Sequence, residues 1–291
     1  MGNIFEIKDI KKEYTSFCLK DVNISCPEGA IMGLIGPNGA GKSTLISILT
    51  GTIRANSGTV TVFGKDIEEL TNDEKEDIGV VFDSNCLPEG LCAKEIDGVF
   101  QLIYKKWDSK KYYDLIDKLQ IPDNKKIKEM SSGNKIKINL AVALSHDPRL
   151  LVLDEITGAL DPVTRDEIME MFLDFIQRED RSILFSSHIT TDLEKVADYI
   201  TFIKDGVIVF SKEKDSLLYD NAIIRCKSSC YSKINKAGII AQRDNSGVFE
   251  ILWDKTISEI DEMQGVVVEK PTVDEIMLII TKGESDERTD S

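Results

Sequence analysis

The sequence predicts an α/β fold with a core of buried strands, followed by a smaller C-terminal α+β region. Continuous apolar runs, such as LLVLD at 150–154 and SILFS at 182–186, are typical of strands that are buried on both faces. Segments with helical character lie between these runs. Beyond about residue 212 the pattern changes to short strands and a hairpin. We therefore predict two domains, residues 1–212 and 213–291.

The first domain begins with strands and one helix. Its first three strand segments are IFEIKDI, DVNISC and AIMGLIG, all within residues 3–36. The run KSTLISILTG predicts a helix that ends at Gly51, because glycine commonly follows the last helical turn. GTVTVFG alternates as a strand does, and IGVVF predicts another strand. Between them, TNDEKED predicts a short polar helix capped by Thr71 or Asn72.

The remainder of the first domain combines helices with buried strands. Residues 86–148 predict a mostly helical subdomain, which includes DSKKYYDLIDKLQ and NKIKINLAVALSH. After the strand LLVLDE, Asp161 and Pro162 begin a helix that extends to about Gln177. SILFSSH predicts a strand and TTDLEKVAD a helix. YITFIKDGVIVFS then predicts two strands that turn at Asp205 and Gly206.

The C-terminal region differs in character from the first domain. A boundary is expected near KEKDSLLYD, at 212–220. The residues that follow predict short strands, a hairpin around DNSG at 244–247, and a helix at PTVDEIMLIITK. The chain ends in GESDERTDS, which is polar and acidic, and we expect this tail to be disordered.

Composition excludes several classes of protein. The 291 residues carry a net charge of −15, with 42% hydrophobic and 30% charged residues. This charge disfavours binding to nucleic acid or to anionic lipid, because both favour clustered Lys and Arg. The N-terminus has no run of signal-peptide type, and no stretch approaches the length of a membrane span. If the protein works at a membrane, we expect another chain to hold it there.

The six cysteines indicate reduced thiols. They are scattered along the chain, which is not the spacing of a disulfide framework. Cys226 and Cys230 are separated by three residues, but no second Cys or His pair lies near them. A zinc site is therefore not expected there.

The strongest motif is GPNGAGKST at 36–44, which fits the phosphate-loop pattern G-x-x-x-x-G-K-[ST] between a predicted strand and a predicted helix. Glycines let the backbone N–H groups converge on phosphate oxygens, and the helix N-terminus adds partial positive charge. Lys42 would reach the β- and γ-phosphates, and the Ser43 hydroxyl would ligate Mg²⁺. The alternative is a glycine-rich turn with no ligand. The candidate nucleotide-binding residues are Gly36, Pro37, Asn38, Gly39, Ala40, Gly41, Lys42, Ser43 and Thr44.

A second motif lies in LLVLDE, where a buried strand ends in two acids. Such a strand places carboxylates at the carboxyl edge of the sheet, beside a phosphate loop. Asp154 would hold Mg²⁺ through water, and Glu155 would orient or deprotonate the attacking water. The alternative is that the two acids only cap the turn that follows.

A third motif, MSSGNKIKINLA at 130–141, resembles the LSGGQ signature of ABC ATPases. Ser131 and Gly133 match that pattern, while Ser132 replaces its first glycine and Asn134 its glutamine. The motif lies between the phosphate loop and LLVLDE, which is the order found in this family. The chain therefore resembles the ABC ATPases over roughly residues 3–212.

The resemblance extends to three further positions. ITGALDP supplies the D-loop residue Asp161, and FSSHI supplies the switch histidine, His188. Tyr14 lies where an aromatic side chain stacks on adenine in this family. The alternatives are a polar strand end for His188 and an ordinary strand aromatic for Tyr14.

The resemblance implies both a fold and a mode of action. The fold would be a P-loop NTPase core of the ABC ATPase type, with an antiparallel β subdomain and a helical subdomain that carries the signature. Two such domains would pair head to tail, with each ATP between the phosphate loop of one and Ser131 and Gly133 of the other. The chain has one phosphate loop, so its partner would be a second copy or a paralogous subunit. ATP and Mg²⁺ are the implied cofactors.

The pattern is most similar to the ATP-binding subunits of Gram-positive exporters of the bacitracin and lantibiotic-resistance type. Such a subunit would lie in the cytoplasm, on the inner face of the membrane, bound to a separate polytopic permease. Its ATPase cycle would drive export of a drug, peptide or lipid-like compound. Two alternatives stay open: a soluble ABC ATPase that acts on a ribosome or DNA, and a regulatory module that holds ATP with little turnover.

Four other residues were assigned from local pattern. Asp83 ends the strand IGVVF where the family has a glutamine, so it is a candidate Mg²⁺ ligand; the alternative is a turn cap. Lys135 and Lys137 lie in a basic run, which is either a solvated helical face or a surface that meets the partner's nucleotide or the permease. His146, in SHDPRL, is expected to be a surface turn residue.

Overall fold

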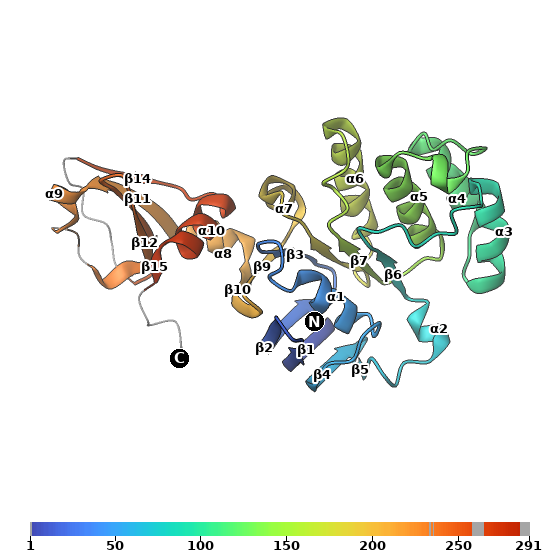
Figure 1. Cartoon of the computed structure of the whole chain (residues 1–291), viewed down its shortest axis with the longest axis horizontal. Helices are drawn as coiled ribbons and strands as arrows, with labels where there is room; N and C mark the ends of the chain where they lie inside the picture. Colours follow the sequence, from blue (N-terminus) through green and yellow to red (C-terminus); the bar gives the residue numbers. More distant parts are fainter. Residues whose placement is uncertain (1, 233, 235, 258–264, 286–291) are drawn as a thin grey trace. The chain divides into compact units, whose positions relative to one another are not determined.

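The computed structural model describes residues 2–232, 234, 236–257 and 265–285. The chain forms two compact units, residues 1–211 and 212–291, and each is described by itself. The first unit contains a four-stranded sheet, a six-stranded sheet and most of the helices (Figure 1). The acidic tail that was predicted to be disordered lies, from residue 286 onward, outside the described residues.

The four-stranded sheet is antiparallel and has the order β2-β1-β4-β5. Its strands are β1 (Asn3–Glu13), β2 (Cys18–Pro27), β4 (Ser57–Val62) and β5 (Lys65–Asp66). Along β1 buried side chains alternate with exposed ones, and Phe5, Ile7 and Ile10 pack in the hydrophobic core of the unit. This alternation is the pattern expected of an antiparallel sheet with one solvated face.

The six-stranded sheet has the order β10-β9-β3-β8-β7-β6, and its strands β9, β3, β8, β7 and β6 run parallel. They are β3 (Ile31–Ile35), β6 (Ile78–Val81), β7 (Leu150–Asp154), β8 (Ser182–Ser186), β9 (Tyr199–Lys204) and β10 (Val207–Glu213). Every residue of β7 and β8 is buried, which confirms the prediction from their continuous apolar runs, and every residue of β3 is buried as well. The turn from β9 to β10 has Asp205 and Gly206 at positive φ, also as predicted.

Three helices pack beside this sheet: α1 (Lys42–Leu49) on β7, α7 (Thr190–Val196) on β3, and α6 (Pro162–Phe175) on α7. Asp161 is the N-cap of α6, and its carboxylate accepts hydrogen bonds from the Val163 and Thr164 N–H groups. The short helix α2 (Asn72–Lys75) has Thr71 as its N-cap in a capping box with Glu74. Both caps stand where the sequence predicted helix starts.

The helical subdomain lies beyond β6 at one end of the first unit (Figure 1). It contains α3 (Ala93–Ile103), α4 (Ser109–Lys118), a 3₁₀ turn η1 (Ile127–Glu129) and α5 (Ser132–Ser145). The buried carboxylate of Asp97 holds α3 to the segment that follows, because it accepts hydrogen bonds from Trp107 Nε1 at 2.8 Å and the Tyr113 hydroxyl at 3.3 Å. α5 packs on α4 and β6 and so connects this subdomain to the parallel sheet.

The prediction that His146 is a surface turn residue is wrong. Only 1% of His146 is exposed, and its ring stacks on Tyr104 with centroids 4.1 Å apart. Its Nδ1 lies 2.8 Å from the carbonyl oxygen of Glu76, and burial lowers its pKa to about 4. The local sequence is polar, but Tyr104, at the C-terminal end of α3, stacks on the imidazole ring and covers it.

The second unit is an antiparallel sheet of order β14-β11-β13-β12-β15 with α10 (Val273–Lys282) against it. Its other elements are α8 (Lys214–Tyr219), β11 (Asn221–Lys227), α9 (Ser228–Tyr231), η2 (Lys236–Gly238), β12 (Ile239–Asn245), β13 (Val248–Asp254), β14 (Val266–Glu269) and β15 (Glu284–Ser285). Trp253 is fully buried within a small core on one face. All six cysteines of the chain lie in the described parts and are free thiols.

Candidate active site

The phosphate loop follows β3 and leads directly into α1. Gly39 and Gly41 have φ angles of 80° and 110°, which only glycine adopts readily. The Lys42 side chain is buried, and its Nζ donates to the carbonyl oxygens of Gly36 at 2.7 Å and Pro37 at 3.2 Å. The loop therefore curls around its own lysine ammonium group.

The N-terminus of α1 offers donors for a phosphate group. Its N-cap residue, Gly41, has no side chain that could accept the N–H groups of the first turn. Those N–H groups and the positive end of the helix dipole are available to an anion, and the Lys42 ammonium lies beside them. The hydrogen-bond donors of this loop therefore fit the phosphates of a nucleoside triphosphate.

Glu155 lies at the carboxyl end of β7 with φ at 53°, and its N–H donates to Ser186 Oγ at 3.0 Å. One carboxylate oxygen is 3.0 Å from Lys42 Nζ, and the other is 2.5 Å from His188 Nδ1. Burial raises the pKa of Glu155, but the hydrogen bonds and charges of His188 and Lys42 outweigh it, so the net pKa is lowered. An ionised carboxylate at this place can accept a proton from a bound water.

Of the metal-ligand candidates, Ser43 and Asp83 line the cavity beside the phosphate loop, whereas Asp154 does not. Ser43 is exposed on the first turn of α1. Asp154 is buried, and its Oδ1 accepts a hydrogen bond from Ser186 Oγ at 2.6 Å. Among the described residues there is no cluster of three or more His, Cys, Asp or Glu side chains arranged as a metal site. The oxygen donors Ser43 and Asp154 suit Mg²⁺, which is commonly held by one or two protein oxygens together with waters and substrate phosphates.

Asp83 follows β6 and faces the same cavity as the phosphate loop. Within the described part of the chain, its carboxylate accepts no hydrogen bond from the turn that follows. That turn is closed by Asn85 instead, whose Oδ1 accepts the Leu87 N–H at 3.2 Å and a bond from Asn139 Nδ2 at 3.1 Å. The Asp83 carboxylate is therefore available to a ligand in the cavity.

These groups surround one cavity of about 760 Å³, which lies within the usual range of roughly 300–1,000 Å³ for ligand sites. The structure brings the phosphate loop, Asp83, Glu155 and His188 together there. The residues that line the cavity are Phe17, Asn38, Gly39, Gly41, Lys42, Ser43, Thr44, Asp83, Glu155, Gly158, Ala159 and His188.

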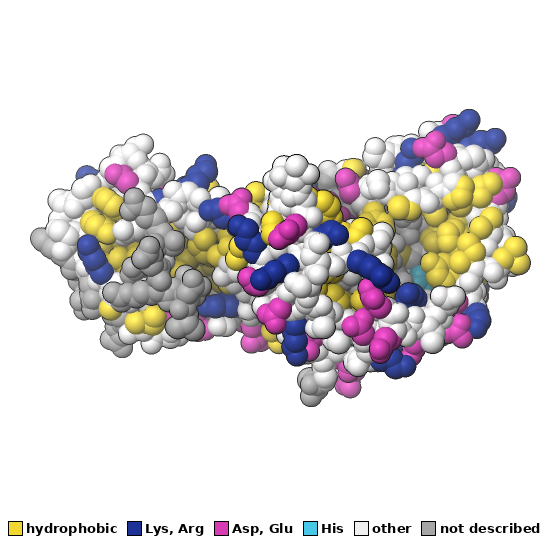
Figure 2. Space-filling model, turned by 60° about the horizontal axis from the view of Figure 1, so that its bottom comes forward, with side chains coloured by type: hydrophobic (Ala, Val, Ile, Leu, Met, Phe, Trp, Pro, Cys, Tyr) yellow, Lys and Arg dark blue, Asp and Glu magenta, His cyan; other side chains and the backbone are white. Residues whose placement is uncertain are grey.

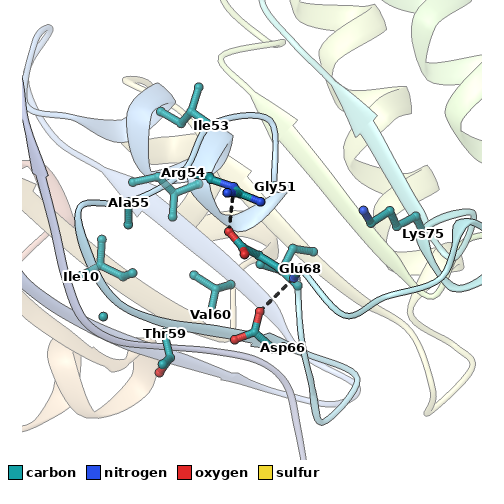
Figure 3. Close-up of a pocket in the computed structure, with 13 residues that line it drawn as sticks. Ile10, Gly51, Ile53, Arg54, Ala55, Thr59, Val60, Asp66, Glu68 and Lys75 are labelled. Carbon is teal, nitrogen blue, oxygen red and sulfur yellow. Dashed lines mark hydrogen bonds and ion pairs between the residues drawn. The ribbon is translucent and has the colours of Figure 1, made fainter.

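A smaller hollow lies elsewhere in the first unit and is shown in Figure 3. Its volume is about 220 Å³, and its lining includes Ile10, Ile53 and Val60. Arg54 and Glu68 form an ion pair at 3.0 Å in its wall (Figure 3). The hollow is smaller than most small-molecule sites and contains none of the predicted site residues. We therefore place the candidate active site at the phosphate loop.

The signature residues do not line this cavity, although a Cβ atom at Gly133 would lie 3.5 Å from the carbonyl oxygen of Ala159, which does. Ser131 is the N-cap of α5, and its Oγ accepts the Asn134 N–H at 3.3 Å. Ser132, Gly133 and Asn134 form the first turn of that helix and do not line the cavity. Lys137 donates to the carbonyl oxygen of Leu119 at 3.1 Å, at the end of α4.

Of two aromatic residues on one loop, the structure places Phe17 in the cavity and not Tyr14. Tyr14 is 48% exposed, is absent from the cavity lining, and has Lys12 Nζ 5.5 Å from its ring centroid. The Phe17 ring packs so closely on Gly41 that a Cβ atom there would lie 2.7 Å from Phe17 Cζ. Sequence reasoning missed Phe17, although a second aromatic residue three positions after Tyr14 was a visible signal.

Comparison with known proteins gives consistent results. A family model described as "ABC transporter" matches residues 19–158. The lantibiotic transport ATP-binding protein SrtF of Streptococcus pyogenes is 34% identical over 229 residues, which are 76% of this chain and 98% of SrtF. The linearmycin resistance ATP-binding protein LnrL of Bacillus subtilis is 30% identical over 267 residues, 89% of this chain and 85% of LnrL.

Solved structures share the fold of the first unit. One is a dimeric ATP-binding cassette in a post-hydrolysis state bound to ADP and Pi, with a TM-score of 0.64 and 23% identity over 72% of this chain and 98% of the other. A second, described as the dimeric structure of a bacterial ABC transporter cassette, has a TM-score of 0.65 and 24% identity over 72% and 98% of the two chains. At this level of identity the likeness shows the fold.

Proposed function

Because this chain belongs to the family of ABC transporter ATPases, we propose that it is the energising subunit of an exporter, which binds and hydrolyses ATP with Mg²⁺ to drive a separate membrane permease. The observation that carries the proposal is the position of Glu155. Its carboxylate contacts both Lys42 and His188 in a cavity whose floor is a phosphate loop. A base, a cation and a switch histidine are thus assembled where a terminal phosphate would lie.

Each side chain has a role in this proposal. Lys42 neutralises charge on the terminal phosphates, and the backbone N–H groups of the loop hold the phosphate oxygens. Glu155 accepts the proton of the attacking water, and His188 orients Glu155 through its 2.5 Å contact. Ser43 and Asp83, with Asp154 through water, would hold Mg²⁺, which supplies charge stabilisation at the phosphates.

We further propose that the site is completed by a second copy or a paralogous subunit. The signature residues Ser131 and Gly133 do not line the cavity of their own chain, so the head-to-tail arrangement places them at a partner's nucleotide. The solved cassettes of the same fold are described as dimeric, which supports the pairing of two such subunits. ATP would then hold the two subunits together, and hydrolysis would weaken the contact.

The head-to-tail arrangement can be tested with a mixture of two inactive variants. Lys42→Ala disables a phosphate loop and Ser131→Ala weakens a signature. In a mixed dimer one composite site combines both defects, and the other contains two wild-type halves. We expect the mixture to recover ATP turnover that neither variant shows alone. If both residues acted in the same chain, the mixture would recover nothing, and the arrangement would be refuted.

A permease requires a docking surface, and we propose the end of α3 for this role. Leu102 is 89% exposed and Ile103 55% exposed, beside the stacked rings of Phe100 and Trp107. We call these four residues the α3 patch, and Figure 2 shows hydrophobic side chains gathered over this end of the first unit. None of the described helices combines the length and hydrophobicity that a membrane-spanning segment needs.

The α3 patch is suited to a permease because of its connection to the active site. The segment that leaves β6 passes Asp83 in the cavity and then leads into α3. A permease helix seated on the patch could therefore respond to changes around the nucleotide. Leu102→Asp should abolish transport while the ATPase rate of the isolated subunit stays within twofold of wild type. The same change at Val209, an exposed residue on β10, is the matched control. Transport that survives Leu102→Asp would exclude the patch as the docking site.

The direction of transport is proposed from the named relatives. One is a lantibiotic transport protein and another confers linearmycin resistance. We therefore propose that the driven permease exports a drug, peptide or lipid-like compound, and that this subunit lies on the cytoplasmic side of the membrane. Purification of the subunit with its permease, followed by transport assays in vesicles of both orientations, tests the direction.

A further inference from the structure

A buried ion pair joins α6 to α7 close to the active site. Arg165 Nε lies 3.9 Å from Asp192 Oδ2, and the Asp192 side chain is 8% exposed. Both atoms are buried, and neither has a hydrogen-bond partner among the described residues. Burial raises the pKa of Asp192, although the charge of Arg165 acts in the opposite direction. Burying such a pair costs desolvation free energy, and apolar side chains of similar volume would join the two helices equally well.

The two partners connect the loops that carry Glu155 and His188. Asp192 lies on the first turn of α7, four positions after His188, and Arg165 lies near the start of α6, which follows the loop that begins at Glu155. Arg165 also donates from Nη2 to the carbonyl oxygen of Leu160 at 3.3 Å. The Asp192 N–H donates to the carbonyl oxygen of Ile189 at 3.2 Å, so the pair is bonded to the loop after β7 on one side and to the loop after β8 on the other.

Two further contacts tie these loops together. Thr157 Oγ1 and Ser187 Oγ are 3.3 Å apart and both side chains are buried. Gly158 packs so closely on the histidine ring that a Cβ atom there would lie 3.0 Å from His188 Cε1. A shift of one loop would thus disturb the other, and the Glu155–His188 contact lies between them.

We propose that Asp192 is a positioning residue: through Arg165 and the backbone of Ile189 it holds the loop 155–161 and the loop 187–189 in one arrangement, so that His188 Nδ1 stays within hydrogen-bond distance of Glu155. Asp192 does not line the cavity and acts only through these neighbours. The proposal rests on the proposed ATPase function of the same site.

The test is Asp192→Asn, which keeps the shape of the side chain and removes its charge. We expect kcat for ATP hydrolysis to fall about 10- to 100-fold, the effect of misplacing a catalytic group by roughly 1 Å. The KM for ATP should stay within twofold, because the phosphate loop is untouched. Asp192→Glu, which restores the charge, should recover most of the rate.

The chain provides a matched control for helix docking. Lys195 and Asp166 form a second ion pair between the same two helices, but this pair is solvent-exposed. Asp166→Asn should therefore leave kcat unchanged. An equal loss of rate in Asp166→Asn and Asp192→Asn would show that only helix docking matters, and it would overturn the proposal.

A readout that does not depend on turnover separates this proposal from the ATPase function itself. The chain has only two histidines, His146 and His188, so their imidazole NMR signals can be distinguished. Asp192→Asn should move the His188 signals and leave those of the buried His146 in place. Unchanged His188 signals would refute the positioning role, whether or not the wild-type protein hydrolyses ATP.

Discussion

Replacing Glu155 by Gln removes one charge from the centre of the candidate site and keeps the size of the side chain. In the structure this carboxylate has two contacts, to Lys42 Nζ at 3.0 Å and to His188 Nδ1 at 2.5 Å. The amide cannot accept a proton from water, so the general base is lost. Such a loss typically costs about 10²- to 10⁴-fold in rate. We therefore expect kcat to fall by that factor, which raises the activation barrier by about 3–5 kcal/mol.

The same substitution should preserve or strengthen the binding of ATP while it lowers the rate of hydrolysis. In the wild-type protein Glu155 competes with the terminal phosphates for the Lys42 ammonium. Releasing the buried Lys42 ammonium from this pair leaves it free for the phosphates, so ATP should bind as tightly as before or up to about fivefold more tightly, which corresponds to about 1 kcal/mol. An ATP-bound dimer should then accumulate on gel filtration, since binding persists and hydrolysis does not.

Phosphate release and direct binding measurements check the two halves of this prediction. Glu167→Gln, on the exposed face of α6, is the control for removal of a carboxylate outside the site. If Glu155→Gln turned over ATP within threefold of wild type, Glu155 would not be the base. If instead ATP affinity fell tenfold, the inferred competition for Lys42 would be wrong.

Three other predictions concern single residues. Phe17→Ala should raise the KM for ATP about tenfold, because stacking on a base is worth roughly 1–3 kcal/mol, whereas Tyr14→Ala should change it less than twofold; the reverse order would identify Tyr14 as the residue that stacks on adenine. Asp83→Gln should remain active but require a different Mg²⁺ concentration for half-maximal turnover, and an unchanged Mg²⁺ titration in Asp83→Ala would remove Asp83 from the metal site. The depressed pKa of His146, about 4 against 6.5, means that the unfolded chain binds a proton at higher pH than the folded chain does. His146 therefore contributes to the free energy of unfolding an amount that is present above pH 6.5 and is lost as the pH falls towards 4. This loss is about 2 kcal/mol between pH 7 and pH 5. Denaturant unfolding of His146→Gln should show a smaller loss over that interval; an identical loss would place the acid sensitivity elsewhere.

The phosphate loop and its neighbours could be predicted from the sequence because their determinants are local. Glycine at positions 39 and 41, a lysine and the start of a helix all fall within nine residues. Glu155 is similarly local, since a fully apolar strand that ends in acids must present them at the edge of the sheet. The N-caps Thr71 and Asp161 were visible for the same reason.

Other parts of the site depend on contacts between distant segments. Tyr14 and Phe17 lie on one loop, and the packing of Phe17 on Gly41 decides which ring enters the cavity. His146 stands in a polar stretch that is typical of a surface turn, and it is buried because Tyr104 stacks on it. The Arg165–Asp192 pair has no pattern in the sequence, since its partners come from two helices separated by a strand.

The sequence by itself therefore determined the order of the elements, the phosphate loop, the acid that follows β7, and the family to which the chain belongs. Backbone conformation and hydrogen-bonding chemistry over a few neighbouring residues are enough to specify these features. Only the tertiary structure decided which aromatic ring enters the cavity, that His146 is buried, and how the loops that carry Glu155 and His188 are joined. Those outcomes depend on packing and desolvation, which arise only when segments far apart in the chain are brought together.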